Sequence, residues 1–182
     1  TIFHALNNFC SVDLSAVYLD ILKDRLYTFR KDSAVRRASQ TVLFDIVVAL
    51  TKLMAPVLSF TAEEIWKTLP ESVRAAAKAD SVHIALFPEV DPRWADAKLA
   101  ERWEQLLEVR VAVQAALEVK RRDKVIGAPL EAKVVIDANA EQYEFLKRYE
   151  QELSSFCIVS DVVLTRADHL AASPGFAVTV EK

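Results

Sequence analysis

The stretch LSAVYLDILKDRLYTF, residues 14–29, places its apolar side chains on one face of a helix. These side chains recur at spacings of three and four residues, which is the period of an α-helix with one buried face. They are Leu14, Val17, Tyr18, Ile21, Leu22, Leu26 and Phe29. We therefore expect a helix from about residue 14, with Ser11 or Asp13 as its N-cap.

Two more helices are expected directly after this stretch. The segment VRRASQTVLFDIVVALTKL, residues 35–53, has a second apolar stripe, and Pro56 ends or kinks that helix. A third helix is expected to begin at Thr61, because Thr61 and Glu64 have the spacing of a capping box. The sequence Leu69-Pro70 closes it.

Beyond residue 70 the pattern changes twice. Residues 71–94 hold charges, alanines and a short extended run, and we interpret them as a loop packed along the bundle. A long helix is expected over about residues 95–122, and after residue 124 β-branched runs typical of strands flank a short amphipathic helix. The sequence therefore predicts a mainly α fold, with a helical bundle over residues 1–124 and a small α/β appendage over residues 125–182.

Composition narrows the classes of protein. The 182 residues contain two glycines, which argues against an all-β fold rich in hairpins, and 52% of the residues are apolar, which is enough for a core. The net charge of −3 means that any nucleic-acid binding must rest on a local basic patch. Cys10 and Cys157 lie far apart, so a cysteine zinc site is excluded and both are expected to be buried.

The chain shows no sign of a membrane span or a leader. No apolar run approaches the ~18 residues that a membrane-spanning helix needs. The N-terminal TIFHALNNF lacks the basic region and cleavage site of a signal peptide, and it starts inside an apolar pattern without an initiator Met. We interpret the chain as a piece of a longer, cytoplasmic protein.

Signals of catalysis are weak. His4, His83 and His169 are widely separated and lack the spacing of metal ligands. There is no glycine-rich phosphate loop and no serine with nucleophile-elbow glycines around it. Glu63 and Glu64 stand at an expected helix start, where they favour the helix dipole. We expect no catalytic activity, metal site or cofactor site in these residues.

Residues 18–40 carry a local positive charge. Six basic and three acidic residues give this segment a charge of +3. The basic residues are Lys23, Arg25, Arg30, Lys31, Arg36 and Arg37. A solvated helix face is one interpretation, because Asp20 and Asp32 can form helical ion pairs there. A phosphate-binding surface is the other, and the residue types leave both open.

A second basic cluster, Lys120, Arg121, Arg122 and Lys124, closes the long helix. Cations at a helix C-terminus favour the dipole, and the same corner is also suited to gripping a phosphate backbone. Arg25 and Arg110 differ from these residues, because each lies at the margin of an apolar stripe. We expect Arg25 and Arg110 to pair with buried carboxylates and to have a structural role.

The three tryptophans fall into two groups, core residues and a loop residue that is available for binding. Trp66 and Trp103 fall on helical stripes and are expected in the core. Trp94 follows Asp91-Pro92 in the expected loop, where an indole is available to stack on an unpaired base.

Several stretches together resemble one family. They are NFCSVDLSAVYLDILKDRLY (8–27), RRASQTVLFDIVVALTKLMAPVLSFTAEEIW (36–66), SVHIALFP (81–88) and KVIGAPLEAKV (124–134). In this order they resemble the region C-terminal to the catalytic domain of bacterial-type isoleucyl-tRNA synthetases, from about Asn8 to Val163. APVLSFTAEEIW is shared with the valyl, leucyl and methionyl relatives, whereas DLSAVYLDILKDRLY, IGAPLEAKV and IVSDVVL point to the isoleucyl member.

The resemblance implies a class I synthetase anticodon-binding bundle followed by a junction-like α/β segment. It implies a parent enzyme that joins isoleucine to tRNA(Ile) with ATP and Mg²⁺, through catalytic and editing domains outside these residues. The HIGH and KMSKS signatures are absent here, and KRRDK at 120–124 is not a degenerate KMSKS. Many bacterial members also carry a C-terminal cysteine-rich zinc module, and FAVTVEK ends about where it would begin.

In this family the bundle packs along the anticodon stem. The resemblance therefore turns the basic residues into expected RNA contacts: Lys23, Arg30, Lys31, Arg36 and Arg37, with Arg121, Arg122 and Lys124 behind them. Two alternatives stay open at this stage. One is the same bundle from a valyl-tRNA synthetase, and the other is a helical module that docks a partner protein.

Overall fold

A computed structural model describes residues 1–171 and 173–182. The chain forms two compact units: residues 1–21 with 96–182, which we call the sheet unit, and residues 22–95, which we call the helical unit. Each unit has its own hydrophobic core. The boundary at residue 124 marks a change in secondary structure along the chain, and its role as a domain boundary stays a prediction.

The chain begins with an uninterrupted helical run, so the predicted helix start near residue 14 is wrong. The run consists of α1 (Ile2–Asn8), the π-helix η1 (Phe9–Leu19) and α2 (Asp20–Tyr27). Thr1 occupies the N-cap position, and the Ser11 hydroxyl donates to the Asn7 carbonyl within the helix instead of capping it. The predicted start lies inside η1, so the prediction captured only the C-terminal part of the run.

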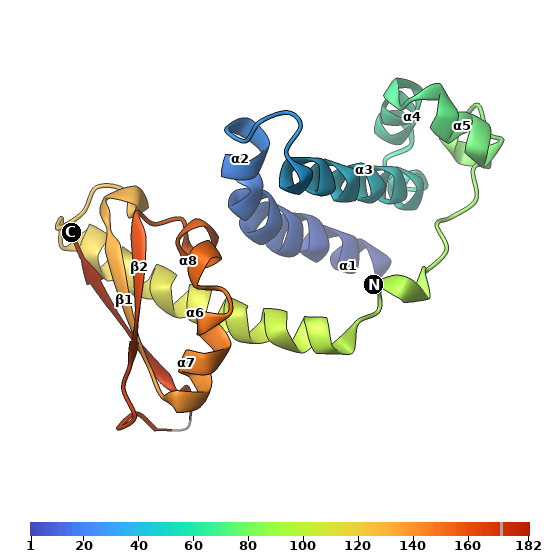
Figure 1. Cartoon of the computed structure of the whole chain (residues 1–182). Helices are drawn as coiled ribbons and strands as arrows, with labels where there is room; N and C mark the ends of the chain where they lie inside the picture. The colour runs from blue at the N-terminus through green and yellow to red at the C-terminus, as the bar shows by residue number, and fades with distance from the viewer. Residues whose placement is uncertain (172) are drawn as a thin grey trace. The chain divides into compact units, whose positions relative to one another are not determined.

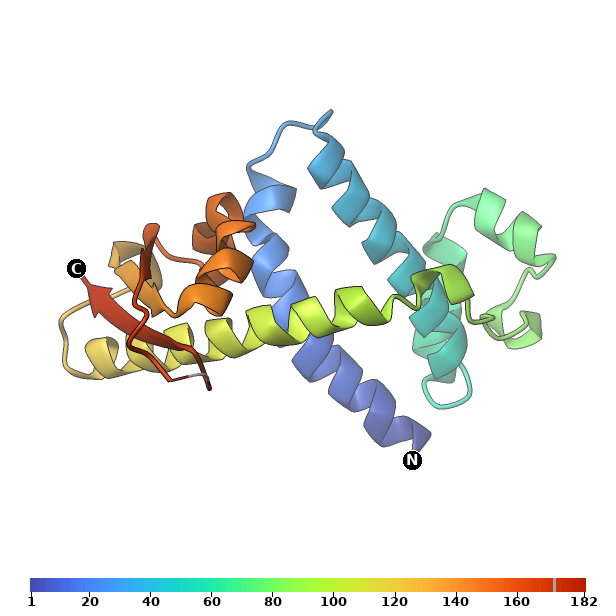
Figure 2. The ribbon, with the colours of Figure 1, turned by 60° about the horizontal axis from the view of Figure 1, so that its bottom comes forward.

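The helical unit is built around α3 (Ala34–Met54), and the expected second helix is confirmed. The other elements are α4 (Ser59–Thr68), α5 (Glu71–Ala77) and the 3₁₀ turns η2 (Val82–Ile84) and η3 (Pro92–Trp94). Both ribbon views show α4 beside the C-terminal end of α3 (Figures 1 and 2). Helix α4 begins two residues before Thr61 without a side-chain cap, so the capping-box prediction is wrong.

Residues 71–94 are more regular than predicted, because α5 occupies 71–77 where a loop was expected. Alanines favour this short helix, and Lys78 ends it in the left-handed conformation at φ 50°. The core beneath it holds Trp66, which is fully buried and donates its indole N–H to the Ala79 carbonyl at 3.1 Å. The prediction of Trp66 as a core residue is confirmed.

The sheet unit has three strands with one helix-covered face. Besides α1 and η1, its elements are α6 (Ala97–Arg122), the 3₁₀ turn η4 (Pro129–Glu131), β1 (Lys133–Ala138), α7 (Ala140–Lys147), α8 (Glu150–Cys157), β2 (Asp161–Arg166) and β3 (Phe176–Glu181). The strand order is β2-β1-β3, with β1 parallel to β2 and antiparallel to β3. Strands form among the β-branched runs after residue 124, as predicted, whereas the predicted single helix between them is two helices.

The core of the sheet unit lies between the sheet and helices α6, α7 and α8 (Figure 1). Alternate β1 residues, Val134 and Ile136 among them, are fully buried, and they share one cluster with Val109 and Val113 of α6. The mainly α fold with a small α/β part is therefore confirmed.

A buried arginine ties together three segments of the sheet unit: α6, α8 and the chain around Asp20. Arg110 on α6 donates from Nη2 to the Asp20 carboxylate at 2.8 Å and from Nη1 to the carbonyl of Phe156 on α8. Its side chain is 3% exposed, while that of Asp20 is 30% exposed. The structural role predicted for Arg110 is confirmed, and that of Arg25, which is half-buried, stays a prediction.

Candidate nucleic-acid interface

The turn between α2 and α3 presents two of the predicted RNA contacts. Arg30 forms a two-point contact with Asp32, with Nη2 2.9 Å and Nε 3.2 Å from the carboxylate oxygens. The two side chains are 86% and 63% exposed, so the pair is strongly screened by solvent. Lys31 beside it is exposed as well. A phosphate can therefore compete for Arg30 at little cost.

The first turn of α3 contains two arginines with different surroundings. The half-buried Arg36 guanidinium donates from Nη1 to the Phe29 carbonyl at 2.8 Å, which fastens the turn to the helix. Arg37 is exposed, and among the described residues it has no ion pair. This turn of α3 has no acidic residue, so the helix dipole adds to the positive potential here.

The acidic residues of the segment have local partners. Asp24 accepts a hydrogen bond from the Thr28 hydroxyl at 2.8 Å, Asp32 holds Arg30, and Asp20 holds Arg110. In place of the helical ion pair expected for Asp32, its carboxylate pairs with Arg30, two residues earlier in the turn. Lys23 on α2 is exposed as well. The five basic residues predicted to contact RNA in this segment all belong to the helical unit, and all except Arg36 are exposed.

The second basic cluster belongs to the sheet unit. Arg121 lies 3.5 Å from Glu118 across one turn of α6, and both are exposed. Lys124 adopts φ 58°, and its N–H donates to the Arg121 carbonyl while the Val125 N–H donates to that of Lys120. This is the left-handed closure of a helix C-terminus. The end of α6 therefore gives this cluster a structural role at a helix C-terminus. The side chains of Arg121, Arg122 and Lys124 are also exposed to solvent.

The two remaining tryptophans are both accessible. The prediction of Trp103 as a core residue is wrong: it is 40% exposed and packs at 5.9 Å against the Phe156 ring. Trp94 is 72% exposed in η3 of the helical unit.

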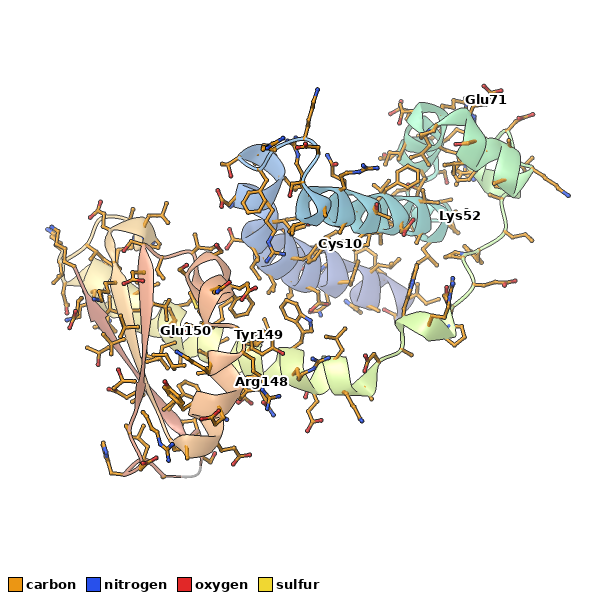
Figure 3. The ribbon with its side chains drawn as sticks, in the orientation of Figure 1. Cys10, Lys52, Glu71, Arg148, Tyr149 and Glu150 are labelled. Carbon is orange, nitrogen blue, oxygen red and sulfur yellow. The ribbon has the colours of Figure 1, made fainter. Side chains whose placement is uncertain are left out.

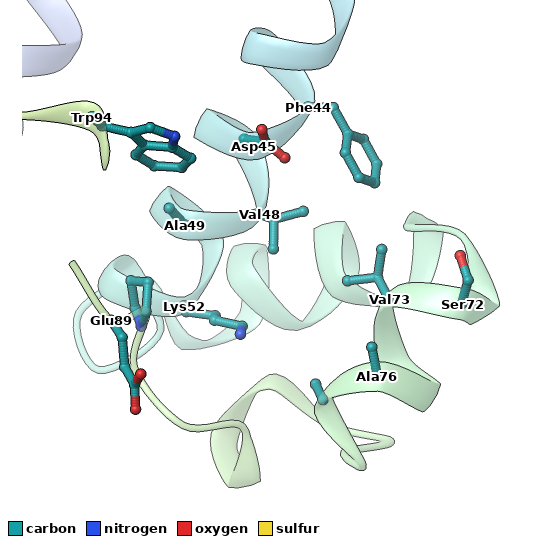
Figure 4. Close-up of a pocket in the computed structure, with 12 residues that line it drawn as sticks. Phe44, Asp45, Val48, Ala49, Lys52, Ser72, Val73, Ala76, Glu89 and Trp94 are labelled. Carbon is teal, nitrogen blue, oxygen red and sulfur yellow. The ribbon is translucent and has the colours of Figure 1, made fainter. Parts of the chain in front are cut away.

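A pocket beside Trp94 was missed by the sequence reasoning. It has a volume of about 500 Å³ and is lined by α3, α5 and residues 88–94, all of the helical unit. Lys52, near the C-terminal end of α3 in Figure 3, is one of its residues, and Figure 4 shows the others around it. The available signal was that Phe44 and Val48 are apolar residues outside the predicted stripe of α3.

Other kinds of site find no support in the described part of the chain. No three His, Cys, Asp or Glu side chains gather there to hold a metal ion. His4, His83 and His169 are all exposed. The helices that the structure describes include none that is long and apolar enough to cross a membrane.

Comparisons with known proteins show the family to which this chain is similar. Residues 1–136 match the family model described as the anticodon-binding domain of tRNA ligase. Isoleucine–tRNA ligase of Syntrophotalea carbinolica is 46% identical over 186 residues, covering 100% of this chain and 20% of that protein. The same enzymes of Geobacter sulfurreducens and Desulfitobacterium hafniense are 47% and 48% identical, covering 90% and 91% of this chain and 17% and 18% of those proteins. The chain thus spans about a fifth of these relatives.

Proposed function

Because this chain belongs to the family of anticodon-binding domains of tRNA ligases, we propose that it binds the anticodon stem and loop of tRNA(Ile). In this proposal it positions the tRNA for ATP- and Mg²⁺-dependent aminoacylation by a catalytic domain elsewhere in a longer parent enzyme. The observation that carries the proposal is the family match over residues 1–136, supported by relatives named isoleucine–tRNA ligase. Those names favour the isoleucine over the valine enzyme.

The α2–α3 turn is the proposed phosphate contact. Lys31 and Arg37 offer exposed cations, and Arg30 can exchange its screened contact with Asp32 for a phosphate. Phosphate contacts fix the register of an RNA, while its unpaired bases carry the sequence information. Arg36 acts differently, because its bond to the Phe29 carbonyl holds the shape of the turn. The cluster Arg121, Arg122 and Lys124 is a second proposed contact on the sheet unit.

The test is equilibrium binding of the chain to tRNA(Ile) at several salt concentrations. Removing two phosphate contacts with Lys31→Ala/Arg37→Ala should weaken binding and reduce the slope of log affinity against log salt by about 1.4 to 1.8. Lys98→Ala/Arg102→Ala, which removes the same charge from exposed positions on α6, is the matched control. Equal losses in both double variants would contradict the assignment to the turn.

A further inference from the structure

We infer that the pocket of the helical unit accepts one unpaired nucleobase of the RNA strand whose phosphates lie on the α2–α3 turn. This inference rests on the proposed function and deepens it. The pocket volume of about 500 Å³ lies within the ~300–1,000 Å³ typical of ligand pockets. Its lining combines two aromatic rings, Phe44 and Trp94, with the polar groups of Asp45, Lys52 and Glu89.

Trp94 lines the pocket from a short 3₁₀ turn that is closed by local hydrogen bonds. The Asp91 carboxylate accepts from the Arg93 backbone N–H at 2.9 Å and from its Nη2 at 2.6 Å, and these bonds lower the pKa of Asp91. Pro92 fixes the backbone between them, and the Trp94 N–H donates to the Asp91 carbonyl. Because these bonds hold the backbone of the turn, stacking the exposed indole on a base orders mainly the Trp94 side chain.

The charges of the lining select a base rather than a phosphate. Asp45 and Glu89 are acidic and Lys52 is basic, so these groups sum to −1. Figure 4 shows the Asp45 carboxylate between the Trp94 and Phe44 side chains. A carboxylate there accepts a hydrogen bond from an exocyclic amino group, as acidic side chains do from cytosine. The pocket is therefore suited to a base with an exocyclic amino group, whereas uracil offers a carboxylate only its N3–H as a donor.

The position of the pocket on α3 connects it to the basic turn. Arg37, Phe44 and Val48 are separated by seven and four residues, so they share one face of the helix. Arg37 and Val48 are eleven residues apart, which corresponds to about 16 Å along the axis. A stacked strand spans about 16 Å with roughly five nucleotides, and an unstacked strand needs fewer. One short strand can therefore reach both places.

The test uses two single-stranded RNA heptamers, heptacytidylate and heptauridylate. Cytosine carries an amino group at C4 and an acceptor at N3, where uracil has a carbonyl and an N–H. Wild type should bind the cytidine heptamer about tenfold more tightly, because a hydrogen bond to a charged acceptor is at stake. Trp94→Ala should weaken binding of the cytidine heptamer about tenfold, whereas Phe60→Ala, which removes an exposed ring on α4 outside the pocket, should not. Asp45→Leu should abolish the preference, and Arg37→Ala should weaken both heptamers equally.

The outcomes separate this inference from the proposed function. If wild type and Trp94→Ala bound both heptamers equally, while Arg37→Ala lost binding, the pocket would not be a base-binding site. The proposed phosphate contact at the α2–α3 turn would remain supported. Failure of wild type to bind either heptamer or tRNA would overturn both. Circular dichroism of each variant confirms that it is folded, and Asp45, being exposed, gives a second variant with little risk to the core.

Discussion

Replacing Arg110 with Met should destabilise the chain far more than an equivalent change on the surface. The substitution removes two charge-assisted hydrogen bonds, one to Asp20 and one to the Phe156 carbonyl, from a side chain that is 3% exposed. Such bonds contribute about 1.5 to 3 kcal/mol each. Asp20 is 30% exposed and regains part of this by hydration, so the net loss should be about 3 kcal/mol.

Thermal unfolding followed by circular dichroism measures this effect. For a protein of this size, about 3 kcal/mol corresponds to a fall in Tm of about 6 to 12 °C. The matched control is Arg30→Met, which breaks the exposed contact with Asp32 and should leave Tm nearly unchanged. If Arg110→Met and Arg30→Met had the same Tm, this would refute the reasoning that burial makes the Arg110–Asp20 pair contribute more to stability than the exposed Arg30–Asp32 pair.

Three further predictions concern single residues. Lys78→Gly should raise the free energy of unfolding by about 1 kcal/mol, because Lys78 is exposed at φ 50° and glycine adopts that conformation freely; a lower Tm would contradict this. Burial raises the pKa of the Cys157 thiol to about 11, so iodoacetamide should modify it much more slowly than Cys10 at pH 8, and equal rates would exclude a buried thiol. Hydrogen bonds from the Ser81 hydroxyl and the Val82 N–H lower the pKa of Glu63 from its ordinary value of 4.5. The ionised Glu63 should therefore stabilise the fold fully above pH 4.5, and this stabilisation should be lost as the pH falls through the lowered pKa. Acid unfolding of Glu63→Gln should accordingly depend less on pH than that of wild type, and parallel curves would count against the assignment.

Much of the helical architecture is readable from the sequence because its signals are local. The stripe of α3 repeats at the helical period and α3 lies where predicted, while β-branched runs after residue 124 indicate the strands β1, β2 and β3. The errors occur where local signals mislead. The helix start predicted near residue 14 falls inside the helical run, within η1, and the capping-box spacing at Thr61 does not coincide with a helix start.

The candidate sites were predictable only in part, for a related reason. The basic turn is contiguous in the sequence, so its charge could be counted, whereas the Arg36 contact with the Phe29 carbonyl depends on the path of the turn. The pocket beside Trp94 brings together residues from α3, α5 and the segment 88–94. No single stretch of sequence contains all of its residues. Because residues 71–94 were predicted to be a loop, helix α5, which lines one side of the pocket, was not expected.

The most direct test of the central claim is a competition experiment. Labelled tRNA(Ile) is bound to the chain at low and at physiological salt, and unlabelled tRNA(Ile) or tRNA(Val) displaces it. The account predicts binding that weakens steeply with salt and a clear preference for tRNA(Ile) as competitor. Salt-insensitive binding, or no binding of either tRNA by the folded chain, would contradict the account.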